Sequence, residues 1–234
     1  MIVFSPAEHK YTNNLTGEEY TSVTRVIGTF KQKFDDQAIS AAVAARKGVS
    51  QQSVLDEWKQ IKDVACEHGT AVHAAIEAYI KDEEYDPIHA AVVTEFARQG
   101  KFKASSGVLS EQLLYDHTFK IAGTADIIVP VGKYFDIIDI KTNDTIHTFS
   151  KYDKYMLTPV DHLSDCEISS YALQLSIYAI LYQRQTGRIP RQLRIFHFDK
   201  ESNQCTQYPL PFLKLEALAL LNAYANTRRN HTSK

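Results

Sequence analysis

Three charged residues near the middle of the chain, Asp126, Asp139 and Lys141, have the types and spacing that could bind a divalent cation and use it. Carboxylate oxygens are the ligands that hard cations prefer, and a lysine beside them can stabilise negative charge that develops in a reaction. Asp126 lies in an apolar, β-branched run, 121–131, and Asp139 lies in the next such run, 134–141. The chemistry depends on whether these runs bring the three side chains together.

The two runs are separated by a Gly-Lys dipeptide at 132–133, a break that is typical of a β-hairpin with a two-residue turn. Counting outward from that turn places Asp126 directly opposite Asp139. Lys141 projects from the same face as Asp139, because side chains alternate along a strand. A bulge at Gly132 would instead shift Asp126 away from Asp139.

The predicted face combines like charges with apolar neighbours. Like charges directly opposite each other destabilise a ladder, and the face also carries Ile128, Phe135 and Ile137. Burying an unpaired carboxylate costs several kcal/mol or forces it to take up a proton. A bound divalent cation removes both problems. The alternative is a solvated hairpin face with a Lys–Asp pair, and the hairpin alone does not decide between the two.

The composition is that of an ordinary globular protein, with 234 residues, 44% hydrophobic and 23% charged. The length suits one large domain. We expect an N-terminal part (1–106), a core (107–212) that contains a long insertion (143–167), and a closing helix and tail (213–234). A net charge of −2 gives no general attraction to nucleic acid or to membranes, so DNA binding would need a local basic patch.

The three cysteines lie far apart and form no CxxC pair, so we expect neither an iron–sulfur cluster nor a zinc ribbon. The chain shows no secretion signal and no long apolar run, which predicts a cytoplasmic protein without a membrane segment.

Hydrophobic periodicity predicts an N-terminal helical region followed by strands and further helices. The predicted strands are 2–4, 10–12, 108–115, 192–199 and 204–208, in addition to the hairpin. The predicted helices are 51–66, 70–81, 87–102, 168–186 and 213–227, with Gly69 separating the first two. This order is typical of an α/β or α+β fold, with a mixed central β-sheet flanked by helices.

Other candidate residues gain meaning only beside the hairpin. His73 and Glu77 share one helix face at i and i+4, which also describes an ordinary helix pair. Glu111 lies on the strand before the hairpin. It could be a distant metal ligand, a group that supports the ligands, or an exposed residue at the edge of the sheet. Ser22 can cap a short helix whose free N–H groups would suit an anion, although a plain N-cap is the more common situation.

The irregular segment 143–167 interleaves lysines with tyrosines, including Lys151 and Lys154. Connections of this length are uncommon unless they are functional. Lysine and tyrosine side chains suit a phosphate backbone and stacked bases, and a covering flap without DNA contacts is the alternative.

Four segments taken together, 69–73, 123–126, 139–141 and 174–178, resemble the motifs of the PD-(D/E)XK nuclease superfamily. The most similar branch is the RecB-like exonucleases, which include mitochondrial genome maintenance exonuclease and phage exonucleases. The opening segment 20–27 also looks like the N-terminus of such phage proteins. The resemblance covers most of the chain and implies a restriction-endonuclease-like fold.

The resemblance also implies roles for individual residues. His73, Asp126, Asp139 and the backbone carbonyl of Ile140 would bind Mg²⁺ or Mn²⁺, and Lys141 would position or activate the attacking water. Gln174 and Tyr178 match a family helix that orients the lysine and contacts DNA. The remaining candidates for DNA binding or for support of the ligands are Glu77, Glu111, Ser22, Thr24, Lys151 and Lys154.

The implied activity is that of a metal-dependent DNA exonuclease which acts on free ends, prefers single strands and leaves 5′-phosphates. Such an enzyme would act in DNA replication, recombination or repair, in the cytoplasm of a bacterium or of a phage-infected host cell. One alternative is a structure-specific or restriction-type endonuclease. Another is a non-catalytic DNA-binding or virion structural domain, against which the intact Asp126, Asp139 and Lys141 argue.

Overall fold

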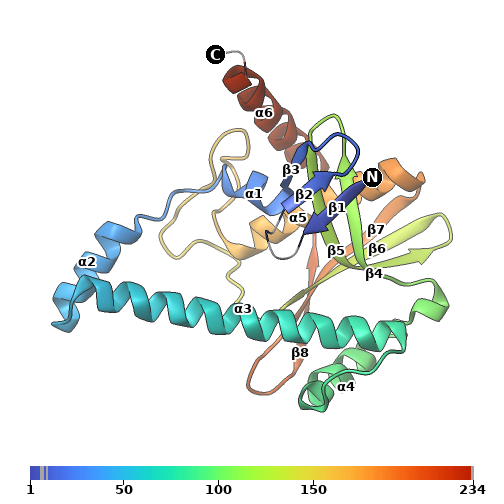
Figure 1. The fold of residues 1–234 in the computed structure, drawn as a ribbon, viewed down its shortest axis with the longest axis horizontal. Coiled ribbons are helices and arrows are strands. Elements are labelled where there is room, and N and C mark those ends of the chain that lie inside the picture. Colours follow the sequence, from blue (N-terminus) through green and yellow to red (C-terminus); the bar gives the residue numbers. More distant parts are fainter. Residues whose placement is uncertain (6–7, 9, 233–234) are drawn as a thin grey trace.

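A mixed β-sheet lies between two layers of helices in the computed structural model, which describes residues 1–5, 8 and 10–232 (Figure 1). The strand order is β1-β2-β3-β5-β6-β7-β8, and β4 pairs with β5 outside this path. Strands β3 and β5 are parallel, as are β6 and β7, and the other neighbouring strands are antiparallel. The predicted mixed sheet flanked by helices is therefore confirmed.

The eight strands are β1 (Ile2–Ser5), β2 (Lys10–Asn13), β3 (Glu19–Ser22), β4 (Leu109–Asp116), β5 (Ile121–Val131), β6 (Tyr134–Lys141), β7 (Ile189–Phe198) and β8 (Cys205–Leu210). The helices are α1 (Val23–Gly28), α2 (Asp36–Lys47), α3 (Gln51–Lys81), α4 (Ala90–Gln99), α5 (Glu167–Thr186) and α6 (Lys214–Thr232). Short 3-10 turns occupy 87–89 and 104–106. The predicted N-terminal helical region corresponds to α1–α3, and residues 233–234 of the predicted tail lie outside the described residues.

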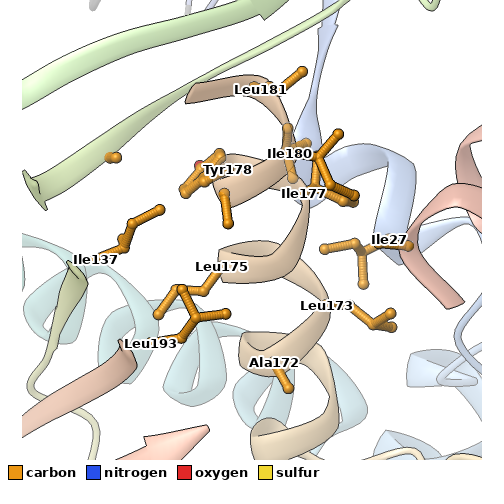
Figure 2. Packing of buried hydrophobic residues seen from close by; sticks show 14 of the residues in the cluster. Ile27, Ile137, Ala172, Leu173, Leu175, Ile177, Tyr178, Ile180, Leu181 and Leu193 are labelled. Atoms are coloured by element: carbon orange, nitrogen blue, oxygen red, sulfur yellow. The ribbon is translucent and has the colours of Figure 1, made fainter. Parts of the chain in front are cut away.

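The two faces of the sheet bury two different cores. On one face α1, α5 and α6 pack against residues such as Phe135 and Ile137, and on the other α3 and α4 pack against Ile138 and Ile140. Successive residues of β6 thus point to opposite layers, as strand geometry requires. Figure 2 shows α5 in the first core, with side chains on several sides of the helix in contact with neighbours. The nearly all-round apolarity of this helix explains why it lies in the interior.

The β5–β6 hairpin has the predicted register. Val131 pairs with Tyr134 across a two-residue turn, and Gly132 has a φ of +58°, a conformation that glycine adopts without strain. The ladder ends at the pair Ile127–Ile138. One step further, the carboxylate of Asp126 accepts a hydrogen bond from the backbone N–H of Ile140 at 2.7 Å. The strands therefore part at the two aspartates, and an opening forms there.

Helix α3 differs from the prediction, because it runs unbroken through Gly69 as a single helix of 31 residues. The predicted break between 51–66 and 70–81 was wrong. A glycine inside a helix costs only about 1 kcal/mol relative to alanine. A Cβ atom at position 69 would lie 3.2 Å from Oγ1 of Thr142, so glycine lets the helix approach the chain just after β6.

The segment between β6 and α5 has no regular element among its residues, all of which are described, apart from an isolated bridge between Tyr155 and Ser164. The chain before α2 fastens it to the rest of the protein. Leu157 donates its backbone N–H to Phe30 at 2.7 Å, and Lys31 forms an ion pair with Asp165 at 3.4 Å. The predicted irregular connection is confirmed. None of the helices in the described part of the chain has the length and apolar character needed to cross a membrane.

Candidate metal centre

The candidate site is a pocket of about 600 Å³ at the point where β5 and β6 part. Helix α3 forms one wall, β4 and β5 form the floor, and the N-terminal strands form another wall. The lining residues are Phe4, Tyr11, Gly69, Thr70, His73, Ala74, Glu77, Glu111, Thr124 and Asp126. A larger open hollow of about 900 Å³ continues along α3, but it is lined by residues of α3 alone. The chemistry-bearing side chains gather in the smaller pocket.

His73, Glu111 and Asp126 each offer one ligand atom, and these three atoms lie within 4.8 Å of one another. Nδ1 of His73 is 3.5 Å from Oδ2 of Asp126. The other ring nitrogen, Nε2, donates to the backbone carbonyl of Ile140 at 3.1 Å. Helix α3 and the three strands β4, β5 and β6 therefore bring an imidazole, two carboxylates and a carbonyl oxygen to one place.

Glu111 is held in an unusual backbone conformation. Its φ is +47°, the left-handed region, although it lies in the middle of β4. The β4–β5 pairs on either side are regular, and the missing pair between them is Glu111 with Asp126. A non-glycine residue in this region costs of order 1 kcal/mol and needs support from its surroundings. Sequence reasoning left the role of Glu111 open, and the structure places its carboxyl group among the candidate ligands.

The electrostatics of this cluster favour a positive charge. Burial of the carboxyl group, followed by the charges of Asp126, Glu77 and Asp139, raises the pKa of Glu111 to about 8. The residue as a whole is exposed, but its carboxyl group is crowded by the pocket wall and by other carboxylates. Near neutral pH it therefore holds a proton that a bound cation would displace.

Asp139 is buried, with 2% of its surface exposed. Its Oδ1 accepts a hydrogen bond from Nε2 of Gln174 at 3.1 Å, and its Oδ2 forms an ion pair with Lys141. Within the described part of the chain, Oδ2 accepts no hydrogen bond of good geometry. Burial raises the pKa of Asp139 to about 6, with Lys141 opposing this effect and Asp126 adding to it. The alternative of a solvated hairpin face is therefore wrong for Asp139, because this residue is buried.

Lys141 is held as a cation. Burial alone would lower the pKa of its ammonium group, but the charges of Asp139 and Asp126 outweigh burial and raise the pKa above its ordinary value. Its Nζ also lies 5.1 Å from the ring centroid of Tyr171, within the range of a cation–π contact. Tyr171 donates in turn to Oδ1 of Asn143 at 3.4 Å.

One face of α5 supplies the contacts behind this ion pair. Tyr171, Gln174 and Tyr178 are three and four residues apart, so they share a helix face, and Nε2 of Gln174 donates to Oη of Tyr178 at 3.5 Å. Tyr178 is buried and packs on the backbone of Gly123. A Cβ atom at position 123 would lie 2.6 Å from Cε1 of that ring. The glycine three residues before Asp126 therefore makes room for the tyrosine.

The remaining predicted residues fall into two groups. Glu77 lines the pocket and forms an ion pair with Lys81. Ser22 caps α1, accepting the N–H of Arg25 at 3.1 Å, and its hydroxyl lies 3.2 Å from that of Thr24. Neither Ser22 nor Thr24 lines the pocket as the described residues form it.

Lys151 and Lys154 lie on the long segment before α5, and both are exposed. Lys151 lines a separate hollow of about 210 Å³ with Lys31 and Phe149. Nζ of Lys154 is 5.9 Å from the ring centroid of Tyr152. The structure thus places a lysine and aromatic surface on this segment, apart from the candidate ligands.

Three aromatic residues of the site were missed from the sequence. Tyr171 was not among the candidate residues, although its position one turn before Gln174 was a usable signal. Phe4 and Tyr11 belong to the wall of the pocket, and Tyr11 reaches Oγ1 of Thr124 at 3.2 Å. These two lie more than a hundred residues from the hairpin, so no local pattern could connect them with it.

The donor set fits a hard divalent cation. Carboxylate and carbonyl oxygens suit Mg²⁺, and an imidazole nitrogen makes Mn²⁺ equally suitable. The buried Oδ2 of Asp139, which lacks a hydrogen bond of good geometry, is a further oxygen that a cation could satisfy. Fold and site together define a mixed-sheet α+β protein with a candidate divalent-metal centre.

No protein-family model matches this chain, and no match was found among curated proteins. Among solved structures, the chain is similar to the crystal structure of SSO0001, with a TM-score of 0.42 and 15% identity over 88% of this chain and 76% of that one. It is also similar to a protein from Eubacterium rectale described as a putative exonuclease. That TM-score is 0.41, with 12% identity over 90% of this chain and 79% of that one. Scores of this size carry no conclusion about activity.

Proposed function

We propose that this protein is a metal-dependent nuclease that hydrolyses phosphodiester bonds of DNA from free ends, with a preference for single strands. The observation that carries the proposal is the cluster of His73, Glu111 and Asp126 beside the buried Asp139–Lys141 pair. The order of the four sequence motifs, which resembles that of RecB-like nucleases, supports the same reading. Replication, recombination or repair of DNA would be the setting of such an enzyme.

Within this proposal, His73, Asp126 and Asp139 hold Mg²⁺ or Mn²⁺, together with the carbonyl of Ile140 and the carboxylate of Glu111. When bound, such a cation lowers the pKa of a coordinated water and neutralises charge on the phosphate. Gln174 keeps the Asp139 carboxylate in one orientation through its hydrogen bond of 3.1 Å.

The positive charge of Lys141 limits what this residue can do in the reaction. A protonated ammonium group cannot accept a proton from water, so it acts by orienting the nucleophile and by stabilising negative charge on the phosphate oxygens. The ring of Tyr171 limits where this group can move, because Nζ lies over the ring. Loss of one such preorganised donor typically lowers kcat by about 100- to 1,000-fold.

The choice of DNA, and of single strands, is supported by the exposed surface of the segment 143–167. The exposed aromatic residues Phe149 and Tyr152 alternate with Lys151 and Lys154. Channels that bind single strands combine positive charge along the backbone with aromatic rings on which bases stack.

The proposal is tested by incubating end-labelled single- and double-stranded DNA with Mg²⁺, Mn²⁺ or EDTA. We expect cleavage that requires the cation and that falls at least about 100-fold in Lys141→Ala. The matched control is Lys133→Ala, which removes an exposed lysine from the turn of the same hairpin and should cleave at the wild-type rate. Full-rate cleavage by Lys141→Ala would contradict the mechanism.

Circular single-stranded DNA separates the two kinds of nuclease. An enzyme that needs a free end leaves the circle intact, whereas cleavage of the circle would establish the endonuclease alternative. Binding of linear DNA without cation-dependent cleavage under any of these conditions would favour the non-catalytic DNA-binding alternative.

A further inference from the structure

The chain just after β6 is held at one residue, Asn143, by three contacts. This residue follows Lys141 by two positions and is half-buried. Its backbone carbonyl accepts a hydrogen bond from Nε2 of His197 at 2.5 Å. Its side-chain oxygen accepts one from the hydroxyl of Tyr171 at 3.4 Å, and its side-chain nitrogen donates to the carbonyl of Thr145 at 2.5 Å. Three polar groups of one residue therefore join β7, α5 and the segment after β6.

We infer that Asn143 is a positioning residue, which fixes the ring of Tyr171 and, through this ring, the ammonium group of Lys141. The inference rests on the proposed function, in which Lys141 orients the nucleophile and stabilises charge on the phosphate. Neither Asn143 nor Tyr171 belongs to the four sequence motifs that support that function. The inference thus adds two residues to those that determine the rate of the reaction.

The contact with His197 fixes the main chain of Asn143 relative to the sheet. His197 is buried and is the partner of Lys141 in the β6–β7 ladder. Its ring also packs edge-on against Tyr208, with the ring centroids 6.2 Å apart. Because the imidazole is confined by the core and bonded to the carbonyl, the side chain of Asn143 starts from a defined point, two residues beyond the lysine.

The contact with Tyr171 carries this order to the ammonium group. Nζ of Lys141 lies 5.1 Å from the centroid of the tyrosine ring, and the hydroxyl at the far end of that ring is the group that Asn143 holds. A hydrogen bond at the far end of a ring restricts its tilt. Since 3.4 Å is long for a bond from a hydroxyl, we expect this contact to orient the ring while adding little to the stability of the fold.

An ordinary turn is the alternative role for Asn143. Asparagine side chains commonly bond to the backbone two residues further on in turns, which accounts for the contact with Thr145. It does not account for the contacts with Tyr171 and His197, which come from two other elements. The turn uses the side-chain nitrogen and the positioning uses the side-chain oxygen, so substitutions can separate the two roles.

The first test measures cleavage of an end-labelled single strand with Mn²⁺. Asn143→Ala should lower kcat by about 10- to 100-fold, because misplacement of a reacting group by about 1 Å can cost on the order of 100-fold. KM should stay within about 2-fold of wild type, since the contact acts in the transition state. Asn143→Asp keeps an acceptor for Tyr171 and loses the donor to Thr145, so its kcat should stay within about 3-fold of wild type.

Combined variants show whether Asn143 acts through Lys141. Tyr171→Phe keeps the ring and removes the hydroxyl, so it should match Asn143→Ala, and the double variant should show no further loss because both changes remove one contact. In the Lys141→Ala background, adding Asn143→Ala should leave the residual cleavage unchanged. Asp144→Ala is the matched control and should cleave as wild type, because this neighbouring side chain is 74% exposed.

The second test needs neither a cation nor turnover. A proton above the face of an aromatic ring is shielded, so the ε-methylene resonance of Lys141 should lie upfield of those of exposed lysines in NMR spectra of lysine-labelled protein. Its absence from the Lys141→Ala protein assigns it. Tyr171→Leu should abolish the shift, and Asn143→Ala should reduce it. Calorimetry should give Asn143→Ala the Mn²⁺ affinity of wild type, since Asn143 is not among the candidate ligands.

Three results would each overturn the inference: an unchanged Lys141 resonance in Asn143→Ala, an equal loss of cleavage in Asn143→Ala and Asn143→Asp, or the same fold-loss in the Lys141→Ala background. Failure of the inference is distinguishable from failure of the proposed function. If wild type cleaves and Asn143→Ala has the same kcat, only the positioning role is removed. If wild type shows no cation-dependent cleavage, the nuclease is removed, and the Lys141 resonance still decides whether Asn143 positions the ammonium group.

Discussion

Replacing Lys141 by methionine removes a buried charge while keeping a long side chain, and it isolates what the ammonium group does for Asp139. The carboxyl group of Asp139 is almost fully buried, and its pKa of about 6 compares with an ordinary value of 3.8. This carboxyl is a group whose pKa rises on folding. Its contribution to stability is therefore complete below pH 4 and is lost as the pH rises toward 6.

The size of the effect follows from these values. A difference of one in pKa corresponds to about 1.4 kcal/mol, so burial of this carboxyl costs the wild-type protein about 3 kcal/mol above pH 6. Lys141 lowers the pKa of Asp139 in the wild type, so we expect its removal to raise that pKa further; a carboxyl that stays protonated at pH 7.5 costs about 5 kcal/mol there. At pH 7.5 the Lys141→Met protein should therefore be about 2 kcal/mol less stable than the wild type. At pH 5 the loss of the ammonium charge should cause no extra destabilisation.

Thermal unfolding in EDTA at the two pH values is the assay. A loss of 2 kcal/mol corresponds to a fall in Tm of about 4–8 °C for a chain of this size, and any effect of packing alone is the same at both pH values. Lys133→Met, an exposed change in the same hairpin, should show no dependence on pH. Saturating Mn²⁺ at pH 7.5 should restore most of the loss, since a cation compensates the carboxylate. An equal fall in Tm at pH 5 and pH 7.5 would refute the reasoning.

Three further changes test other contacts. Gly123→Ala places a methyl group 2.6 Å from the ring of Tyr178, and it should cost about 1–3 kcal/mol by overpacking in chemical denaturation. Glu111→Gln should weaken Mn²⁺ binding in calorimetry and abolish the rise in affinity near pH 8, where the wild-type carboxyl loses its proton. Alanine at both Lys151 and Lys154 should lower the salt slope of single-strand binding by about 1.4 if both contact phosphates; an unchanged slope would show that they do not.

The hairpin was predictable because a short turn fixes its register. A glycine at the first turn position and a two-residue loop leave one pairing of the strands, and the pairing observed from Val131–Tyr134 to Ile127–Ile138 is that one. What the turn could not reveal is where the ladder stops. The strands part at Asp126 because its carboxylate accepts a hydrogen bond from the backbone N–H of Ile140. This contact depends on tertiary structure.

Two helices show why the rest was harder to predict. The helix α2 was not expected, because only Ser40 and Ala44 among its residues are buried, and so few apolar contacts leave a weak periodic pattern. The break predicted at Gly69 did not occur; this glycine leaves room for Thr142, just after β6, which is a tertiary contact that the sequence pattern does not reveal. The contacts of Phe4 and Tyr11 with the site join segments that are distant in sequence, and local patterns carry no information about such contacts.

The middle of α3 has a mechanical consequence for the molecule. Val54 is buried near the start of the helix, where Gln51 contacts Ser40 of α2. Val72 is buried against the sheet layer, whereas no residue of the described helix between Val54 and Val72 is buried. Eighteen residues of helix span about 27 Å, and Figure 1 shows α2 at the far end of this span. The exposed stretch is thus a stiff spacer, which transmits any tilt of its inner end near His73 to α2 as a larger displacement.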